Sequence, residues 1–235
     1  MADIVQVFME AGIDAVYGVT PDAPDLIDAI KDAEDRTGRK CIRISIPSID
    51  TQNDPDGWAA TERILDAHAA CGTDILMPHQ NSTDALVDRR AQCIRNIDPY
   101  LAMIRDRGMI PGLSTHMPET IAYADAAGLD VATYIQIYNA AGFLMQVEVD
   151  WVHRIIWEAR KPVIVIKPLA AGRLQPLVGL AFVWGTLREQ DMVTVGTMSV
   201  DEAAEIIEYS LALLERRKPE LDLQRTRSKA SIEMI

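Results

Sequence analysis

The sequence predicts an α/β fold of the (β/α)8-barrel type in which seven strands can be recognised. Short apolar runs rich in Val and Ile alternate with longer amphipathic segments, in units of about 30 residues. Repeated alternation of this kind indicates a parallel sheet with right-handed crossovers. An open doubly wound sheet shows the same alternation, but it usually carries a Gly-x-Gly-x-x-Gly pattern after its first strand. Because that pattern is absent, the sequence favours the barrel.

Seven strands and eight helices follow from the periodicity of the apolar residues. The expected strands are 15–19, 41–46, 74–77, 109–113, 132–138, 163–167 and 192–196. The expected helices are 2–11, 24–35, 58–71, 98–107, 118–127, 148–159, 175–188 and 200–217. The pattern begins with a helix, although an eight-stranded barrel begins with a strand. We therefore expect the first strand to be missing from the sequence, or its place to be taken by a neighbouring element.

Length and composition are those of one globular domain. Of the 235 residues, 49% are hydrophobic, which is enough for a single large core. We expect the barrel to span residues 1–217 and a tail to span 218–235. The formal net charge of -12 and the lack of a long basic block argue against a nucleic-acid partner. No apolar run reaches the roughly 18 residues of a membrane span, so the expected partner is a small molecule.

The cysteines and the tail bear on location and assembly. The three cysteines lie far apart without a Cys-x-x-Cys pair, which predicts reduced thiols and a cytoplasmic protein. The tail is charged and then apolar at Ile232, Met234 and Ile235. It is expected to cover the barrel mouth or to reach a neighbouring subunit. An incomplete barrel edge would also favour pairing, so a homo-oligomer is a further expectation.

Lys167 is the most unusual residue of the expected strands. It closes the apolar run 163–166 and precedes a loop of small residues, Pro-Leu-Ala-Ala-Gly at 168–172. An ammonium group at the end of a buried strand is unfavourable unless it is paired or has a function. Lys167 is therefore a candidate for Schiff-base or base chemistry, or for holding a substrate carboxylate or phosphate.

Side-chain alternation along the strands predicts which residues share a pocket with Lys167. If Ile42, Ile44 and Ile46 face the helices, their neighbour Arg43 faces the barrel interior. The same alternation places Gln136 and Tyr138 on the interior face of strand 132–138, and Lys167 on that of strand 163–167. It predicts that the catalytic residues Arg43, His79, Tyr138 and Lys167, together with Gln136, meet at the carboxyl ends of the strands, with His116 and Tyr17 at the rim.

Several segments, in order along almost the whole chain, resemble the aldo/keto reductases, a family of TIM barrels. They are Gly-Ile-Asp-Ala-Val at 12–16, Pro-His at 78–79, Gly-Leu-Ser-Thr at 112–115, Gln-Ile-Tyr-Asn at 136–139, Lys-Pro-Leu-Ala-Ala-Gly-Arg-Leu at 167–174, and Val-Gly-Thr-Met-Ser at 195–199 with Glu202. The resemblance implies that the chain begins inside the family's first helix, which would account for the missing strand.

The resemblance implies a carbonyl reductase, but the family's catalytic residues are not all present. The family uses an Asp, a Tyr, a Lys and a His. Tyr17 stands at the position of the Asp, Val-Thr-Pro-Asp at 19–22 replaces the region of the Tyr, and Ser-Ile-Pro-Ser at 45–48 replaces the region of the Lys. His79 alone is in place. A positioned proton donor is central to hydride reduction, so the standard reductase mechanism is not expected.

The resemblance also implies residues for an NAD(P) cofactor. In the family, the counterparts of Ser114, Thr115 and Gln136 hold the nicotinamide amide. The loop with Gly172 and Arg173 and the turn with Gly196 and Thr197 would face the phosphates. The turn 197–202 has no Lys or Arg, which weakens NADPH binding and leaves NAD(P) only a possible cofactor.

Three functions remain open from the sequence. The first is a divergent aldo/keto reductase-like enzyme that acts on a small polar carbonyl or sugar-like metabolite, with His79 as acid or base and Lys167 and Arg43 as charge partners. The second is a lyase or aldolase that uses Lys167 as a Schiff base, or a metal ion held by His79 and His116 with Asp50 or Asp22. The third is a non-catalytic barrel that binds a metabolite or serves in an assembly.

Overall fold

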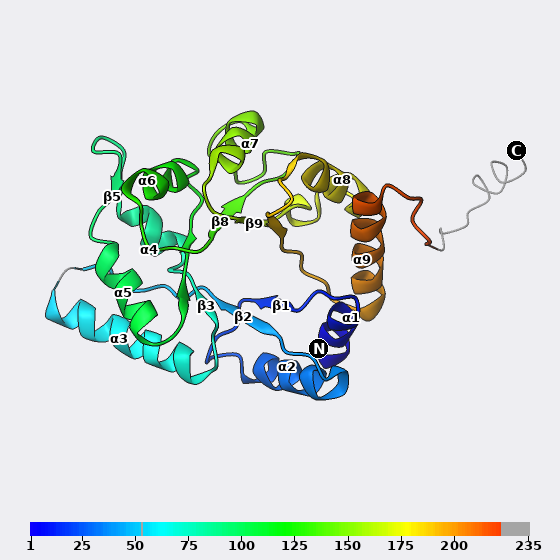
Figure 1. The fold of residues 1–235 in the computed structure, drawn as a ribbon, viewed down its shortest axis with the longest axis horizontal. Coiled ribbons are helices and arrows are strands. Elements are labelled where there is room, and N and C mark those ends of the chain that lie inside the picture. Colours follow the sequence, from blue (N-terminus) through cyan, green and yellow to red (C-terminus); the bar gives the residue numbers. More distant parts are fainter. Residues whose placement is uncertain (53, 222–235) are drawn as a thin grey trace, which may run out of the picture.

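The computed structural model describes residues 1–52 and 54–221, and it has the predicted (β/α)8-type architecture. Figure 1 shows parallel strands around a central space, with helices on the outside. The strands of this ring are β1 (Ala15–Tyr17), β2 (Ile42–Ser45), β3 (Ile75–Leu76), β6 (Ile110–Pro111), β7 (Leu113–Ser114), β8 (Tyr134–Ile137), β9 (Val163–Ile166) and β10 (Met192–Val193). Their order in space is β1-β2-β3-β6 and then β7-β8-β9-β10.

Strands β6 and β7 are two halves of one strand that bends at Gly112. The amide of Gly112 donates to the carbonyl of Leu76, so the chain still follows β3 at the bend. A Cβ atom at this position would lie 2.7 Å from Cγ of Met77 and 2.8 Å from the carbonyl oxygen of Thr133. Only glycine fits such a close approach. The bend thus links the two four-stranded sheets into one continuous wall.

The eight predicted helices are confirmed, with boundaries that differ by a few residues. They are α1 (Ala2–Glu10), α2 (Pro24–Thr37), α3 (Pro55–Ala70), α5 (Asp98–Asp106), α6 (Glu119–Ala127), α7 (Val149–Glu158), α8 (Pro176–Thr186) and α9 (Val200–Glu215). Side-chain caps fix two of their starts. Asp54 accepts a hydrogen bond from the amide of Gly57, and Ser199 accepts one from the amide of Glu202.

Three short elements were not predicted. They are α4 (Gln80–Ala85), the hairpin of β4 (Val87–Asp88) with β5 (Cys93–Ile94), and the 3-10 turn η1 (Ala170–Gly172). Helix α4 consists of Gln-Asn-Ser-Thr-Asp-Ala and has no apolar periodicity. Its position comes from tertiary contacts, which a pattern search along the sequence does not detect.

The core has an inner and an outer layer, and the predicted side-chain alternation is wrong for β2, β8 and β9. The inner layer packs Ile44, Ile135, Ile137, Ile164 and Ile166 with Met77. The outer layer packs Tyr134, Tyr138, Val163 and Val165 against helix residues such as Val152, Ile156 and Leu180. Strand β9 is apolar at every position, as is common for strands buried on both faces, so its sequence does not reveal which face is inside. In β2 and β8 the isoleucines face the interior, and Arg43 and Gln136 face the helices.

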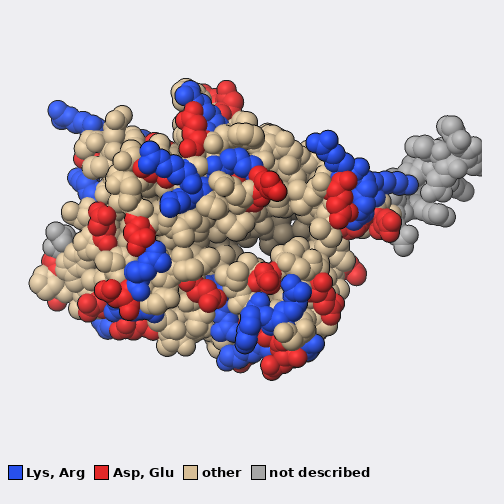
Figure 2. Space-filling view, viewed as in Figure 1, with Lys and Arg blue, Asp and Glu red and all other residues tan. Residues whose placement is uncertain are grey.

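The ring of strands is open between β1 and β10 in the described part of the chain. Strand β1 pairs with β2 and strand β10 with β9, and neither has a second neighbour among the described residues. Outside this gap the helices still meet, because α1 packs against α9 and α2. Figure 2 shows openings between the side that carries β1 and β2 and the side that carries α8 and α9. The sequence prediction that one barrel strand has no counterpart agrees with this gap.

Two further expectations concern the surroundings of the fold. Among the described residues, no helix combines the length and the apolar character that crossing a bilayer requires. The apolar residues at the end of the tail, Ile232, Met234 and Ile235, lie outside the described residues. Whether the tail covers the barrel mouth therefore stays a prediction.

Candidate functional site

Lys167 follows directly after β9 and has a left-handed backbone, with φ of 58°. Residues other than glycine rarely adopt this conformation. In a continued strand its side chain would share the outward face of Val163 and Val165, but the backbone turn breaks that alternation. Lys167 is half-buried, and no hydrogen bond or ion pair joins its ammonium group to another described residue. Its charge is thus available at the carboxyl ends of the strands.

His79 lies at the corresponding end of β3 and caps the start of α4. The amide of Asn81 lies 3.3 Å from Nδ1 of the imidazole, and Oδ1 of Asn81 lies 2.9 Å from the same nitrogen. Asn81 is itself hydrogen-bonded to Ser48, which follows β2. The ring is therefore oriented through Nδ1. Its Nε2 atom has no partner among the described residues and is available to a ligand.

His116 follows β7 and is placed by Asp84 of α4. The hydroxyl of Thr115 donates to Oδ1 of Asp84, and the amide of His116 donates to Oδ2 at 3.1 Å. Thr115 is fully buried, and its hydroxyl also lies 3.0 Å from that of Thr120. Burial raises the pKa of Asp84, while these two donors and the charge of His79 act in the opposite direction. Asp84 thus fixes the loop that carries His116.

The electrostatics of His116 show that three basic groups lie close together. Burial lowers the pKa of His116, and the charges of Lys167 and then of His79 lower it further. A neutral imidazole beside an ammonium group can donate a hydrogen bond from one ring nitrogen and accept one at the other. The carboxyl ends of β3, β7 and β9 therefore bring His79, His116 and Lys167 into one basic cluster.

Tyr17 contributes to the barrel interior from the end of β1. It packs against the inner isoleucine layer and is half-buried. Burial raises its pKa to about 12, so the phenol stays protonated at neutral pH. The sequence placed Tyr17 at the rim of the pocket, on a face that the structure also directs inward.

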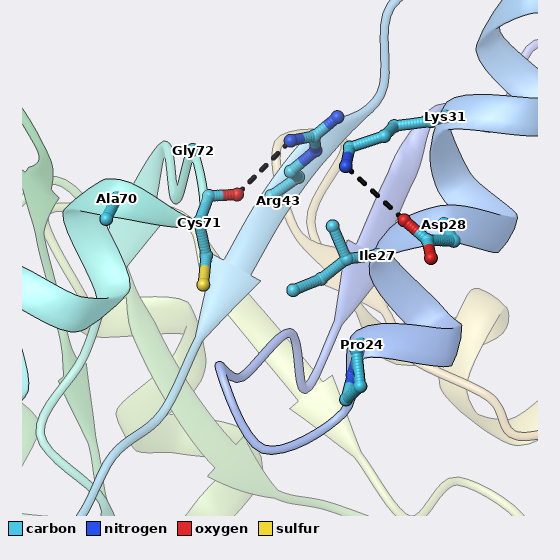
Figure 3. Close-up of a pocket in the computed structure, with 8 residues that line it drawn as sticks. All are labelled: Pro24, Ile27, Asp28, Lys31, Arg43, Ala70, Cys71 and Gly72. Atoms are coloured by element: carbon cyan, nitrogen blue, oxygen red, sulfur yellow. Dashed lines mark hydrogen bonds and ion pairs between the residues drawn. The ribbon is translucent and has the colours of Figure 1, made fainter.

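Arg43 does not join the cluster, so its predicted convergence with Lys167 is wrong. Its guanidinium lies in the outer layer, 2.9 Å from the carboxylate of Glu34 and 3.2 Å from the carbonyl oxygen of Cys71. Figure 3 shows it beside an outer groove of about 400 Å³, lined by α2 and the end of α3. Lys31 in this groove pairs with Asp28. The groove is lined by none of the three residues His79, His116 and Lys167, and its charged groups are mostly paired.

Tyr138 and Gln136 also face outward, contrary to the prediction. The hydroxyl of Tyr138 lies 3.1 Å from that of Thr186 on α8, and its ring packs against Phe182. Gln136 is fully buried on the same side of β8. Its Nε2 donates to the carbonyl of Ile137, and its Oε1 has no partner among the described residues. Both side chains belong to the packing between the sheet and the helices.

The residues expected to hold NAD(P) do not fit that cofactor. Gln136 faces the helices, and the hydroxyl of Thr115 is already bonded to Asp84 and Thr120. Ser114 is also buried. Arg173 stacks over the ring of Phe143 at 3.9 Å and donates to the carbonyl of Ala170. The remaining predicted residues, Gly172, Gly196 and Thr197, lie in the loops after β9 and β10, and the turn 197–202 offers no cation to a phosphate.

The metal alternative finds no ligand set in the described part of the chain. No group of three or more His, Cys, Asp or Glu side chains is placed there to hold an ion. Asp50, which was considered as a third ligand, accepts a hydrogen bond from the amide of Gln52 in its own loop. His79 and His116 are thus better described as acid–base or binding groups.

Sequence reasoning missed Asp84. It lies in α4, within the polar run Gln-Asn-Ser-Thr-Asp at 80–84 that follows His79 at the end of a strand. In a barrel, the polar residues after the strands line the functional face. That position could have pointed to Asp84, but its partners Thr115 and His116 are some 30 residues away and meet it only in the folded chain.

Comparisons with known proteins identify the fold. No family model matches the chain, and no curated protein matches it. Among solved structures, the Pseudomonas aeruginosa protein PA4992, named as an aldo-keto reductase, is similar with a TM-score of 0.65 and 17% identity, over 91% of this chain and 80% of that one. Aldo-keto reductase AKR2E5 of the silkworm Bombyx mori is similar with a TM-score of 0.56 and 11% identity, over 95% of this chain and 79% of that one. D-psicose 3-epimerase in the presence of D-fructose is similar with a TM-score of 0.52 and 14% identity, over 92% of this chain and 91% of that one.

These identities are too low to assign an activity or a family, and they establish the architecture alone. The neighbours include reductases and an epimerase, and TIM barrels of one architecture support many reactions through their loops. The chain has a (β/α)8-type TIM-barrel fold, in which the described strands leave one gap.

Proposed function

We propose that this protein is an enzyme that acts on a small polar carbonyl compound or a sugar, by acid–base chemistry rather than by hydride transfer. The observation that carries the proposal is the cluster of His79, His116 and Lys167 at the carboxyl ends of three strands. Active sites of TIM-barrel enzymes lie at this face. An outer-layer role for all three residues would leave this clustering unexplained.

Each residue of the cluster has a distinct role in the proposed reaction. His79, oriented through Nδ1, would transfer a proton through its free Nε2. The ammonium of Lys167 would stabilise negative charge on the bound substrate. His116, whose pKa is lowered by burial and by the neighbouring charges, would offer its imidazole to the substrate as a hydrogen-bonding group. Asp84 would hold the His116 loop in place without touching the substrate.

The structural neighbours support the substrate class. One of them is D-psicose 3-epimerase, whose structure was determined in the presence of D-fructose, and two are named as aldo-keto reductases. Sugars and aldehydes or ketones share a carbonyl group. Because the groups expected to hold NAD(P) do not fit, proton transfer next to a carbonyl is the better-supported reaction.

Exchange of substrate protons with deuterium tests the proposal without a cofactor. A panel of ketoses, hydroxyaldehydes and 2-oxo acids is incubated with the protein in D₂O, and deuterium next to the carbonyl is followed by NMR. His79→Gln is expected to lower the exchange rate about 10²–10⁴-fold. His153→Gln, on the outer helix α7, is the control and should leave it unchanged. The proposal fails if no compound exchanges above the buffer rate, or if His79→Gln exchanges as fast as the unmodified protein.

A second candidate is Schiff-base chemistry at Lys167. Amines that form Schiff bases are often found beside other cationic groups, and Lys167 lies beside two histidines without a carboxylate partner in the described residues. Borohydride reduction in the presence of each carbonyl compound, followed by mass spectrometry, would trap an adduct. Absence of any adduct on the peptide that contains Lys167 argues against this candidate and leaves the acid–base proposal standing.

A further inference from the structure

The charge around the cluster differs from that of the chain as a whole. The protein carries 35 acidic and 23 basic residues. Near the histidines, however, the carboxylates are already engaged. Asp84 accepts hydrogen bonds from Thr115 and His116, and Glu119, the next acidic group whose charge reaches Asp84, is paired with Arg89. No described carboxylate neutralises Lys167.

The loop after β9 holds its cations by an unusual backbone. Lys167, Ala170 and Ala171 all have φ between 50° and 58°, although none is glycine. Such residues are strained and persist only where the surrounding structure fixes them, which is often at ligand sites. The carbonyl of Lys167 accepts from the amide of Ala170, and that of Ala170 accepts from Nη1 of Arg173. The strained turn thus sets the positions of Lys167 and Arg173 together.

Arg173 adds to the positive potential at the mouth of the barrel. Its guanidinium stacks on Phe143, from the loop after β8, and it forms no ion pair with a described carboxylate. A guanidinium held flat on an aromatic ring keeps its charge and loses little conformational freedom when it binds an anion. Lys167 and Arg173 are therefore two cations of one loop that no described carboxylate neutralises.

We infer that the substrate carries a carboxylate or phosphate group, which Lys167 and the imidazole of His116 hold while His79 acts on the neighbouring carbonyl. Arg173 attracts the same anion from the edge of the site. This inference rests on the proposed function, because it names the substrate class for the same cluster. Its physical reason is that an anion would supply the negative partner that Lys167 lacks, and it would also favour the protonated form of His116.

The four histidines of the chain make the inference directly measurable. Their ring signals are assigned with His→Asn variants and titrated with pH by NMR, first alone and then with inorganic phosphate, pyruvate or neutral dihydroxyacetone. Phosphate or pyruvate should move the titration midpoint of His116 upward by about 0.5 pH or more, since a nearby anion stabilises the imidazolium. The signals of His68 and His153 should not move. Comparing phosphate with pyruvate shows which anion the site prefers.

Matched variants separate Lys167 from a general charge effect. Lys167→Asn should weaken anion binding about tenfold, which corresponds to about 1.4 kcal/mol, and Lys167→Arg should restore most of it. Asparagine tolerates a left-handed backbone, so the variant is expected to fold. Lys161→Asn, which removes an exposed lysine at the opposite end of β9, should bind as the unmodified protein does.

The outcomes distinguish this inference from the proposed function. A His116 midpoint that does not respond to either anion, or equal weakening by Lys167→Asn and Lys161→Asn, overturns the inference. If neutral dihydroxyacetone nevertheless undergoes exchange that depends on His79, the proposed function survives without an anionic substrate. If anions bind at Lys167 but no carbonyl compound undergoes proton exchange, the anion site is supported and the proposed enzymatic function is refuted.

Discussion

Arg43 and Glu34 form a buried ion pair in the outer layer of the barrel, with 2.9 Å between Nη2 and Oε2. The side chains are only 15% and 8% exposed. The same glutamate accepts from the amide of Cys41, and the guanidinium donates to the carbonyl of Cys71. The pair therefore ties α2 to β2 and to the end of α3. It explains why Arg43, a plausible substrate anchor in the sequence, has a structural role in the fold.

Removing one partner of this pair should destabilise the protein strongly. Arg43→Met leaves buried Glu34 with only the exposed Lys40, 3.8 Å away, as a cation, and loss of a buried partner typically costs about 3–5 kcal/mol. Arg39→Met, which removes an exposed arginine 3.8 Å from Asp14, should cost less than about 1 kcal/mol. Urea unfolding measures both. The Arg43→Met variant should still catalyse proton exchange on the best substrate at temperatures below its unfolding transition. Loss of exchange under these conditions would show that Arg43 belongs to the active site.

Asp84 should make stability depend on pH with a defined sign. Its folded pKa is raised, mainly by burial. The resulting stabilisation is complete below the unfolded value near 3.8 and is lost as pH rises through the folded pKa. The unfolding free energy of the unmodified protein should thus fall relative to that of Asp84→Asn as pH rises from about 4 towards neutrality. Asp106→Asn, at an exposed position, is the control: the difference between its unfolding free energy and that of the unmodified protein should not change with pH. A difference that is also flat for Asp84→Asn contradicts the assignment.

Tyr17 should ionise only at unusually high pH, and its ionisation should then destabilise the fold. Its pKa is raised to about 12 by burial in the barrel interior. The associated stabilisation is complete below the unfolded value of 10.0 and is lost as pH rises through about 12. Tyr17→Phe should lack this loss between pH 10 and 12. The phenolate absorbance that disappears in Tyr17→Phe gives the midpoint, and a midpoint near the ordinary value would show that Tyr17 is solvated.

Gln136 should be replaceable without loss of function. Its buried Oε1 has no partner among the described residues, which carries a desolvation penalty of about 1–3 kcal/mol. Gln136→Met has a similar volume and removes that group, so we expect unfolding free energy to stay equal or to rise by about 1 kcal/mol. Gln136→Glu, which buries a charge in the same place, should destabilise the protein. A variant Gln136→Met that loses substrate or nucleotide binding would instead show that Gln136 faces a ligand.

Hydrogen exchange can test the gap in the strand ring residue by residue. The amide of Gly18 bonds to Ile44 on β2, and that of Thr194 bonds to Val165 on β9. Because amides alternate in direction along a strand, those of Tyr17 and Val193 point into the gap. They should exchange much faster than those of Gly18 and Thr194 when followed by NMR. Equal protection would mean that another strand completes the ring in solution.

The fold was accessible from the sequence because its evidence is local and repeated. Helices such as 98–106 and 200–215 show clear apolar periodicity, and every strand of the ring lies within or beside a predicted run. The open place between β1 and β10 was also visible, as a pattern that starts with a helix. What failed was the direction of individual side chains. In β2 and β8 the isoleucines face the interior rather than the helices, and β9 is apolar on both faces, so alternation alone gave the wrong interior.

The candidate site also contains residues that the sequence reveals and residues that only the folded structure reveals. His79 and Lys167 could be singled out because a basic residue at the end of an apolar strand is visible in the sequence. Asp84 could not, since its role depends on hydrogen bonds to Thr115 and His116 across about 30 residues. Arg43 was misplaced for the opposite reason, because its partner Glu34 comes from a helix whose packing the sequence does not specify.

The sequence by itself therefore determined the architecture and the two basic residues at the strand ends, because each leaves a local pattern. Tertiary structure alone decided which face of each strand is inside and which charges are paired. It also decided that Lys167 leaves its strand through a left-handed backbone. These features arise from contacts between segments far apart in the chain, so no local pattern carries them.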